Sequence, residues 1–130
     1  MSSWYKIRLD PADVAFSKFI RLRDKRCVHP TCTRVGEPDA KGFPIKGLQA
    51  SHFHSRRKES TRYDEENVDA LCAFHHDLWA GGNRNIDYRA FKLSQLGQER
   101  LDLLDFRAEQ YCKKDRKMRL IEAKELMKTL

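Results

Sequence analysis

Four residues at metal-ligand spacing constrain the fold of this chain more than any other feature. Cys27 and Cys32 are separated by four residues, and Cys72 and His75 by two. Zinc prefers thiolate and imidazole ligands, and four of them close its tetrahedral shell without leaving a position for a substrate. The sequence therefore predicts a structural Zn²⁺ site made by Cys27, Cys32, Cys72 and His75.

The chain is short enough for such an ion to matter to its stability. With 130 residues, it is expected to form a single domain over residues 1–130. Zinc-finger peptides gain roughly 10–16 kcal/mol from their ion, so zinc is expected to supply much of the folding free energy here. The alternative is that the three cysteines are unrelated free thiols, as expected for Cys112, which has no partner at metal-ligand spacing.

The N-terminal part predicts one amphipathic helix over residues 10–26. Asp10 is typical of an N-cap, and Pro11 suits the first helical position. Apolar residues at helical spacing follow, and the end of the segment is basic, which complements the negative end of a helix dipole or contacts DNA.

Residues 27–82 predict a small core of two strands and one helix. Glycine and proline residues punctuate the first part and indicate loops. Short strands are expected over residues 48–53 and 67–71, with a polar surface loop over residues 55–66 between them. A helix is expected to begin near Cys72 and to end at the Gly81–Gly82 pair.

Residues 87–130 predict a helical C-terminal segment. A helix is expected from about Asp87, and Gly97 marks a break. No glycine or proline follows Gln98, and apolar residues recur at helical spacing, so we expect one long charged helix from Gln98 onward. That helix is expected to project from the body or to pair with a second copy as a homodimer.

The charge of the chain favours a polyanionic partner. The formal net charge is +7 and the sequence pI is about 9.4, which suits nucleic acid. No apolar run approaches the ~20 residues of a membrane span, so a membrane protein is not expected. The start of the chain lacks the apolar core of a secretory signal, and a cytoplasmic location with reduced cysteines is expected.

Two histidines and an asparagine of the core are candidate catalytic residues. His52 ends the first expected strand, Asn67 opens the second, and His76 follows the zinc ligand His75. Consecutive residues of an α-helix point about 100° apart, so His75 can face zinc while His76 faces the strands. We therefore expect His52, Asn67 and His76 to share one surface.

Three pieces of this sequence resemble the HNH nuclease motif, which belongs to the ββα-metal fold. They are Ala50-Ser51-His52, residues 67–72 and the pair His75-His76. Residues 16–24, which precede the cysteine pair, and Gly82-Asn83 with Tyr88-Arg89 resemble phage NinG-type recombination nucleases. The likeness covers residues 16–89. It implies a small α+β fold in which a zinc-stabilised HNH core is flanked by an N-terminal helix and a long C-terminal helix.

The resemblance also implies roles for the candidate residues. His52 is expected to act as the general base that takes a proton from water, and His76 to bind a catalytic ion, Mg²⁺ or another divalent cation. Asn67 either binds that ion or holds the loop between the strands. A metal ion neutralises a non-bridging phosphate oxygen and stabilises the leaving oxygen, which is what hydrolysis of a phosphodiester requires.

Two positions depart from the HNH pattern. Ser51 stands where many such motifs have an Asp or His that binds the ion, so the ion needs another ligand, for example His54, Asp69, a backbone carbonyl or water. His75 stands where a second zinc cysteine is usual. This leaves open which of His75 and His76 binds zinc and which binds the catalytic ion.

The loop between the two strands carries the candidate DNA-binding residues. Arg56, Arg57, Lys58 and Arg62 supply four cations against one anion over residues 55–63. Arginine grips phosphate with two parallel hydrogen bonds, and such contacts position a backbone without reading its sequence. The alternative is an ordinary solvated loop. The NinG-type resemblance implies recombination-associated DNA, branched or single-stranded, as the partner.

Two functions are consistent with these patterns. The first is a metal-dependent DNA endonuclease with a structural zinc. The second is a non-catalytic zinc-containing module that binds DNA or serves recombination as an accessory protein, and Ser51 is the feature that favours it.

Overall fold

The computed structural model describes residues 9–130 and shows a small α+β protein, as the sequence predicts. Six α-helices and one 3₁₀-helix accompany two small antiparallel sheets in this part of the chain. In chain order the elements are α1 (Pro11–Asp24), β1 (Glu37–Pro38), β2 (Pro44–Lys46), β3 (Leu48–His52), α2 (Glu59–Arg62), β4 (Val68–Cys72), α3 (Ala73–Leu78), η2 (Gly82–Arg84), α4 (Ile86–Leu96), α5 (Gln98–Ala108) and α6 (Arg116–Met127).

Helix α1 begins where its capping residues predict. The Asp10 carboxylate accepts a hydrogen bond from the Ala12 N–H at 2.8 Å, which satisfies one of the free amides of the first turn. The helix ends at Asp24, two residues before the expected end, because Lys25 adopts a left-handed conformation with φ 63°. Its buried face supplies Phe16 and Ile20 to the core.

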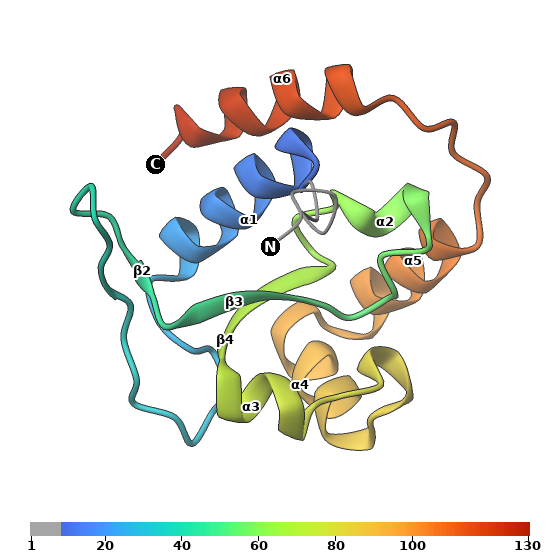
Figure 1. The fold of residues 1–130 in the computed structure, drawn as a ribbon. Helices are drawn as coiled ribbons and strands as arrows, with labels where there is room; N and C mark the ends of the chain where they lie inside the picture. The colour runs from blue at the N-terminus through green and yellow to red at the C-terminus, as the bar shows by residue number, and fades with distance from the viewer. Residues whose placement is uncertain (1–8) are drawn as a thin grey trace, which may run out of the picture.

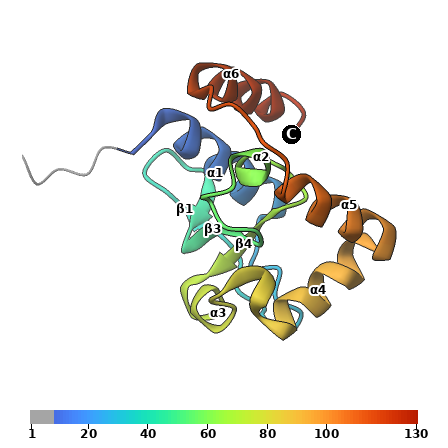
Figure 2. The ribbon, with the colours of Figure 1, turned by 90° about the vertical axis from the view of Figure 1, so that its right-hand side faces the viewer.

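The β3–β4 hairpin forms the centre of the molecule. The strands pair antiparallel, with Leu48 opposite Cys72, Ala50 opposite Ala70 and His52 opposite Val68. Helix α1 covers one face of this hairpin, and α3 and α4 lie on the other (Figure 1), an order that the view from the side preserves (Figure 2). Side chains alternate between the faces of a strand, so neighbouring residues of β3 meet different helices.

A buried polar network fixes α4 to the lower face of the hairpin. The Asp69 carboxylate lies 2.9 Å from the Lys92 ammonium, and both side chains have no solvent exposure. Asp69 also accepts hydrogen bonds from the Tyr88 hydroxyl at 2.8 Å and from the Gln95 amide at 3.1 Å. A buried charge pair is tolerated only with such additional partners, so this network determines which helix covers the Ser51–Asp69 side of the sheet.

Two stretches predicted as loops contain regular structure. Residues 27–47 include the short antiparallel β1–β2 hairpin between their turns. The expected surface loop over residues 55–66 contains α2, and Thr61 within it is fully buried. The prediction failed there because the segment is polar in sequence, while its burial depends on α5, which packs against α2 from far along the chain.

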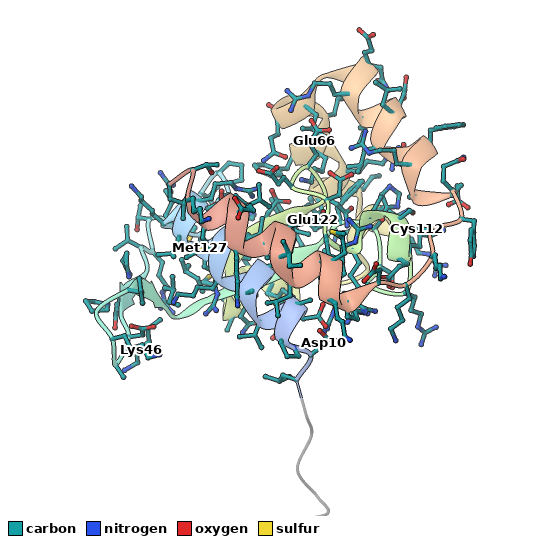
Figure 3. The ribbon with its side chains drawn as sticks, turned by 90° about the horizontal axis from the view of Figure 1, so that it is seen from above. Asp10, Lys46, Glu66, Cys112, Glu122 and Met127 are labelled. Atoms are coloured by element: carbon teal, nitrogen blue, oxygen red, sulfur yellow. The ribbon has the colours of Figure 1, made fainter. Side chains whose placement is uncertain are left out.

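The C-terminal prediction of one long helix is wrong. Residues 98–130 form two helices, because Asp115 caps a new helix by accepting a hydrogen bond from the Met118 N–H at 3.0 Å. The second helix, α6, does not project: it lies across α1, as Figure 3 shows from above. Met118 and Ile121 remain 49% and 56% exposed on it, so a homodimer through α6 stays a prediction.

Candidate metal centre and neighbouring cavity

The structure brings the four predicted zinc ligands together from two distant segments. Cys27 and Cys32 lie in the loop after α1, which is closed by a bridge between Arg26 and Val35. The Val28 N–H donates to the Ala70 carbonyl at 3.0 Å and fastens this loop to β4. Strand β4 ends at Cys72, which is also the N-cap residue of α3, and His75 follows on that helix.

The spacing of the ligand atoms fits a tetrahedral zinc ion. Zn–S bonds of ~2.3 Å and Zn–N bonds of ~2.0 Å place sulfur and nitrogen about 3.5 Å apart across a tetrahedral angle. The His75 Nδ1 atom lies 3.6 Å from the Cys27 Sγ and 3.2 Å from the Cys72 Sγ. All four ligand atoms lie within 4.8 Å of one another and are buried. These residues can therefore hold a structural metal such as zinc, and His75 rather than His76 completes the set.

The surroundings of the cluster support a closed structural site. Burial raises the pKa of the Cys27 thiol to about 11, so without an ion this thiol stays protonated at neutral pH. Burial alone raises the pKa of Cys72 too, but the His75 backbone N–H and the neighbouring thiols lower it below its ordinary value. The His29 ring stacks on His75 at 4.0 Å between centroids, which restricts the ligand ring. Cys112 is outside the cluster, and its Sγ accepts a hydrogen bond from Arg119.

His52 lies on the α1 face of the hairpin, with one ring nitrogen fixed. Its Nε2 atom is 2.9 Å from the Arg62 carbonyl oxygen. A carbonyl oxygen only accepts, so Nε2 carries the proton and Nδ1 carries the lone pair in the neutral ring. Burial is the main cause that lowers the pKa of His52 to about 4, and the nearby Arg56 guanidinium lowers it further. The imidazole is therefore neutral at pH 7.

A cavity of about 360 Å³ adjoins His52 between α1 and β3. Its polar lining side chains are Asp13, Ser17, Arg21, Gln49, His52 and Arg56. No sequence pattern marks Asp13, Ser17 and Arg21 as members of a site. They lie on a helix about 30 to 40 residues before His52, and only the packing of α1 on the hairpin brings them there.

The Asn67 side chain is hydrogen-bonded to the backbone of the loop between the strands. Its Oδ1 atom accepts from the His54 N–H at 2.7 Å, and its Nδ2 donates to the carbonyls of His54 and Thr61 at 3.0 and 2.9 Å. The side chain has no exposure, so its amide is fully used inside the protein. These contacts match the second of the two roles that the resemblance implies, in which the asparagine holds the loop between the strands, and a part for Asn67 in catalysis stays a prediction.

His76 does not join His52 at this cavity. It lies on α3, on the far side of the hairpin from α1, and α3 contributes no residue to the lining of the cavity. The expected common surface of His52, Asn67 and His76 is thus divided between two faces of the sheet, because successive positions in β3 alternate and α3 is held beside Tyr88 by Trp79. His54 is buried and its Nε2 lies 2.8 Å from Asp105, which favours a structural role for it.

Three of the four predicted DNA-binding side chains already have acidic partners. The Asp13 carboxylate accepts from Arg62 at 2.9 Å and from Arg56 at 3.2 Å, and Lys58 pairs with Glu109 at 2.7 Å. Burial alone raises the pKa of Asp13, but its hydrogen bonds with Arg62 and Tyr63 lower it to about 2, so it stays ionised. Within residues 9–130, Arg57 has no ion pair and is exposed.

Comparison with known proteins adds no family assignment. No protein-family model matches the chain, and neither a curated protein nor a solved structure matches it. Among the helices of residues 9–130, none has both the length and the apolar character needed to cross a membrane.

Proposed function

We propose that this protein is a metal-dependent DNA endonuclease of the HNH type that hydrolyses phosphodiester bonds and is stabilised by a structural zinc ion. The proposal combines the resemblance of the sequence motifs with the geometry around His52. Branched or single-stranded DNA is the proposed substrate, and this choice rests on the NinG-type resemblance alone.

The observation that carries the proposal is the state of the His52 ring. Its Nε2 proton is committed to the Arg62 carbonyl, so Nδ1 is available to accept a proton from water. A pKa of about 4 makes the free ring a weak base. A phosphodiester bound nearby raises that pKa, because an adjacent negative charge favours the imidazolium and offsets the positive potential of Arg56. The substrate itself thus brings the base toward its working range.

The charges around the cavity suit a phosphate group. Arg21 and Arg56 line it, and a guanidinium can donate two hydrogen bonds to non-bridging oxygens. Asp13 holds Arg56 and Arg62 beside His52, so the cations are positioned before substrate binds. This arrangement supplies electrostatic stabilisation for the negative charge that develops in the transition state.

The catalytic ion has no complete ligand set in residues 9–130. The one cluster of three or more metal-ligating side chains there is the zinc quartet, and His76 stands apart from His52. A divalent ion, when bound, neutralises phosphate charge and stabilises the leaving oxygen.

The decisive experiment is cleavage of plasmid and branched DNA with added Mg²⁺ or Mn²⁺. We expect wild type to nick or cut DNA and His52→Ala to lose at least about 100-fold in rate, which is the usual contribution of a general base. Zinc content and thermal midpoint are measured for both proteins, so that misfolding is recognised. Unchanged cleavage by His52→Ala would refute the mechanism. His76→Ala, compared in the same assay, tests whether this histidine binds the catalytic ion.

The alternative function is a non-catalytic zinc-containing module that binds DNA or assists recombination. The separation of His76 from His52, together with Ser51 in place of a ligand, favours it. Its signature is DNA binding by wild type without cleavage of any DNA form under any divalent ion.

A further inference from the structure

A second cavity lies on the other side of the loop that follows β3. It measures about 750 Å³, twice the size of the cavity at His52. One wall is formed by Phe53, Ser55, Arg57 and Lys58, and the other by residues 81–84, with Glu109 at the rim. None of residues 81–84 is among the predicted DNA-binding residues.

The two walls are joined by a close backbone contact. The Asn83 N–H donates to the Phe53 carbonyl at 2.8 Å. Gly82 has φ +56°, and a Cβ atom there would lie 2.3 Å from the same carbonyl oxygen, so no larger residue fits without a shift. Residues 81–84 are therefore held at a fixed position beside the loop, which makes the groove a built feature and not the gap between two independent loops.

The groove offers hydrogen-bond donors and uncompensated positive charge. Arg57 and Arg84 are exposed, and neither has an ion pair within the part of the chain that the structure describes. The third cation, Lys58, is balanced by Glu109 at 2.7 Å. The groove thus carries a net charge of about +2, and guanidinium groups suit phosphate oxygens, which only accept.

Two consecutive arginines, Arg56 and Arg57, line different cavities, and this favours a polymeric ligand. Arg56 lines the cavity at His52, whereas Arg57 lines the second cavity. A single small anion can occupy only one of these places. A nucleic-acid strand carries a phosphate at each nucleotide, so it can place one phosphate beside His52 and others in the second groove.

We propose that Arg57 and Arg84 in this groove bind backbone phosphates of a DNA strand. These phosphates are the ones that flank the phosphate at His52. The assignment rests on the proposed function for the identity of the ligand. Binding is independent of base sequence, because these contacts reach only the backbone.

Equilibrium binding tests the assignment separately from cleavage. A short fluorescein-labelled single strand, and the same strand in a duplex, are titrated with protein without Mg²⁺ or Mn²⁺ over a range of salt concentrations. Arg57→Ala and Arg84→Ala are each expected to weaken binding on the order of 5-fold. Each should reduce the slope of log K against log salt by about 0.7 on the single strand and about 0.9 on the duplex.

Two further variants control for general charge effects. Lys46→Ala removes an exposed cation at a distant edge of the molecule (Figure 3) and is expected to leave the slope unchanged. Glu109→Gln removes the acid at the rim of the groove and releases Lys58, so it is expected to tighten binding and to steepen the slope.

The outcomes separate this inference from the proposed function. Unchanged slopes for both arginine variants, or an equal loss in Lys46→Ala, would overturn the groove assignment even if His52-dependent cleavage is found. Loss of binding in the arginine variants and gain in Glu109→Gln would support the groove, even if wild type cuts no DNA and the nuclease proposal fails.

Discussion

Replacing Cys72 by Ser tests whether the cysteine–histidine cluster is the main cross-link of the fold. Cys72 sits at the junction of β4 and α3, and its sulfur lies 3.2 Å from the His75 Nδ1 atom. Through Cys27 and Cys32 the ion would connect this junction to the loop after α1. The substitution removes one thiolate while the hydroxyl stays close to the size of the original group.

The size of the effect follows from the length of chain that the ion closes. A cross-link between Cys32 and Cys72 encloses about 40 residues, and constraining such a loop in the unfolded chain contributes about 4 kcal/mol. Domains of this kind have only about 5–15 kcal/mol of total stability. Since one kcal/mol shifts the thermal midpoint of a domain of this size by roughly 3–5 °C, we expect Cys72→Ser to lower it by about 15 °C.

The assay combines thermal unfolding by circular dichroism with metal analysis of the same samples. Wild type is expected to bind one zinc per chain, and Cys72→Ser is expected to lose it. Cys112→Ser is the matched control, because Cys112 is outside the cluster and its substitution should change neither quantity. A strong chelator should bring wild type to the midpoint of the variant or below it.

The reasoning is refuted if zinc-free wild type keeps the midpoint of the zinc-bound protein. It is equally refuted if Cys72→Ser retains one zinc per chain with an unchanged midpoint. The first result would mean that the ion does not hold the loop of Cys27 and Cys32 on β4. The second would mean that Cys72 is not a ligand of the ion.

Three further predictions concern positions around the hairpin. Asn67→Ala should lower the free energy of unfolding by about 3 kcal/mol, because it leaves buried backbone groups of the loop unpaired; urea unfolding measures this, and a change below about 1 kcal/mol would show that the loop does not depend on Asn67. Gly82→Ala should cost about 2 kcal/mol or more by the same measurement, because of its positive φ and the contact with the Phe53 carbonyl, and a neutral effect would contradict the close approach. The pH dependence of the free energy of unfolding should reveal His52, because its pKa is about 4 in the folded state and near 6.5 in the unfolded chain. Between these values the unfolded chain binds more protons, so the free energy of unfolding falls as pH drops from about 6.5 to about 4. Relative to His52→Gln, wild type should lose up to about 3 kcal/mol across that window and nothing above pH 7, and a parallel pair of curves would rule out a buried neutral imidazole.

Local sequence signals predicted much of the metal centre and the element order. Capping by Asp10, the strand pair and the ligand spacing all depend on residues close together in the chain or on the fixed preferences of an ion. The same local signals do not predict that a new helix begins after Asp115. An Asp can cap a helix or lie on its exposed face, and the apolar spacing after Gln98 is compatible with both.

The predicted common surface of His52 and His76 is absent for a physical reason that no sequence motif contains. The sequence predicts that His52 and His76 converge, because the ~100° step from His75 to His76 lets His75 face zinc while His76 faces the strands. Whether they do depends on which face of the hairpin α3 occupies, and the buried Asp69–Lys92 pair and the stacking of Trp79 on Tyr88 decide that. The sequence therefore identifies the two histidines as candidates, but it does not predict on which face of the sheet each one lies.

The amino-acid sequence by itself determined which side chains can hold an ion and which can take up a proton, because those properties belong to thiols and imidazoles wherever they lie. Tertiary structure alone decided that Asp13 meets Arg56 and Arg62 beside His52, and that Arg57 and Arg84 face one groove. These groups are brought together by helices that pack across the hairpin, and packing depends on the whole buried surface rather than on any spacing along the chain.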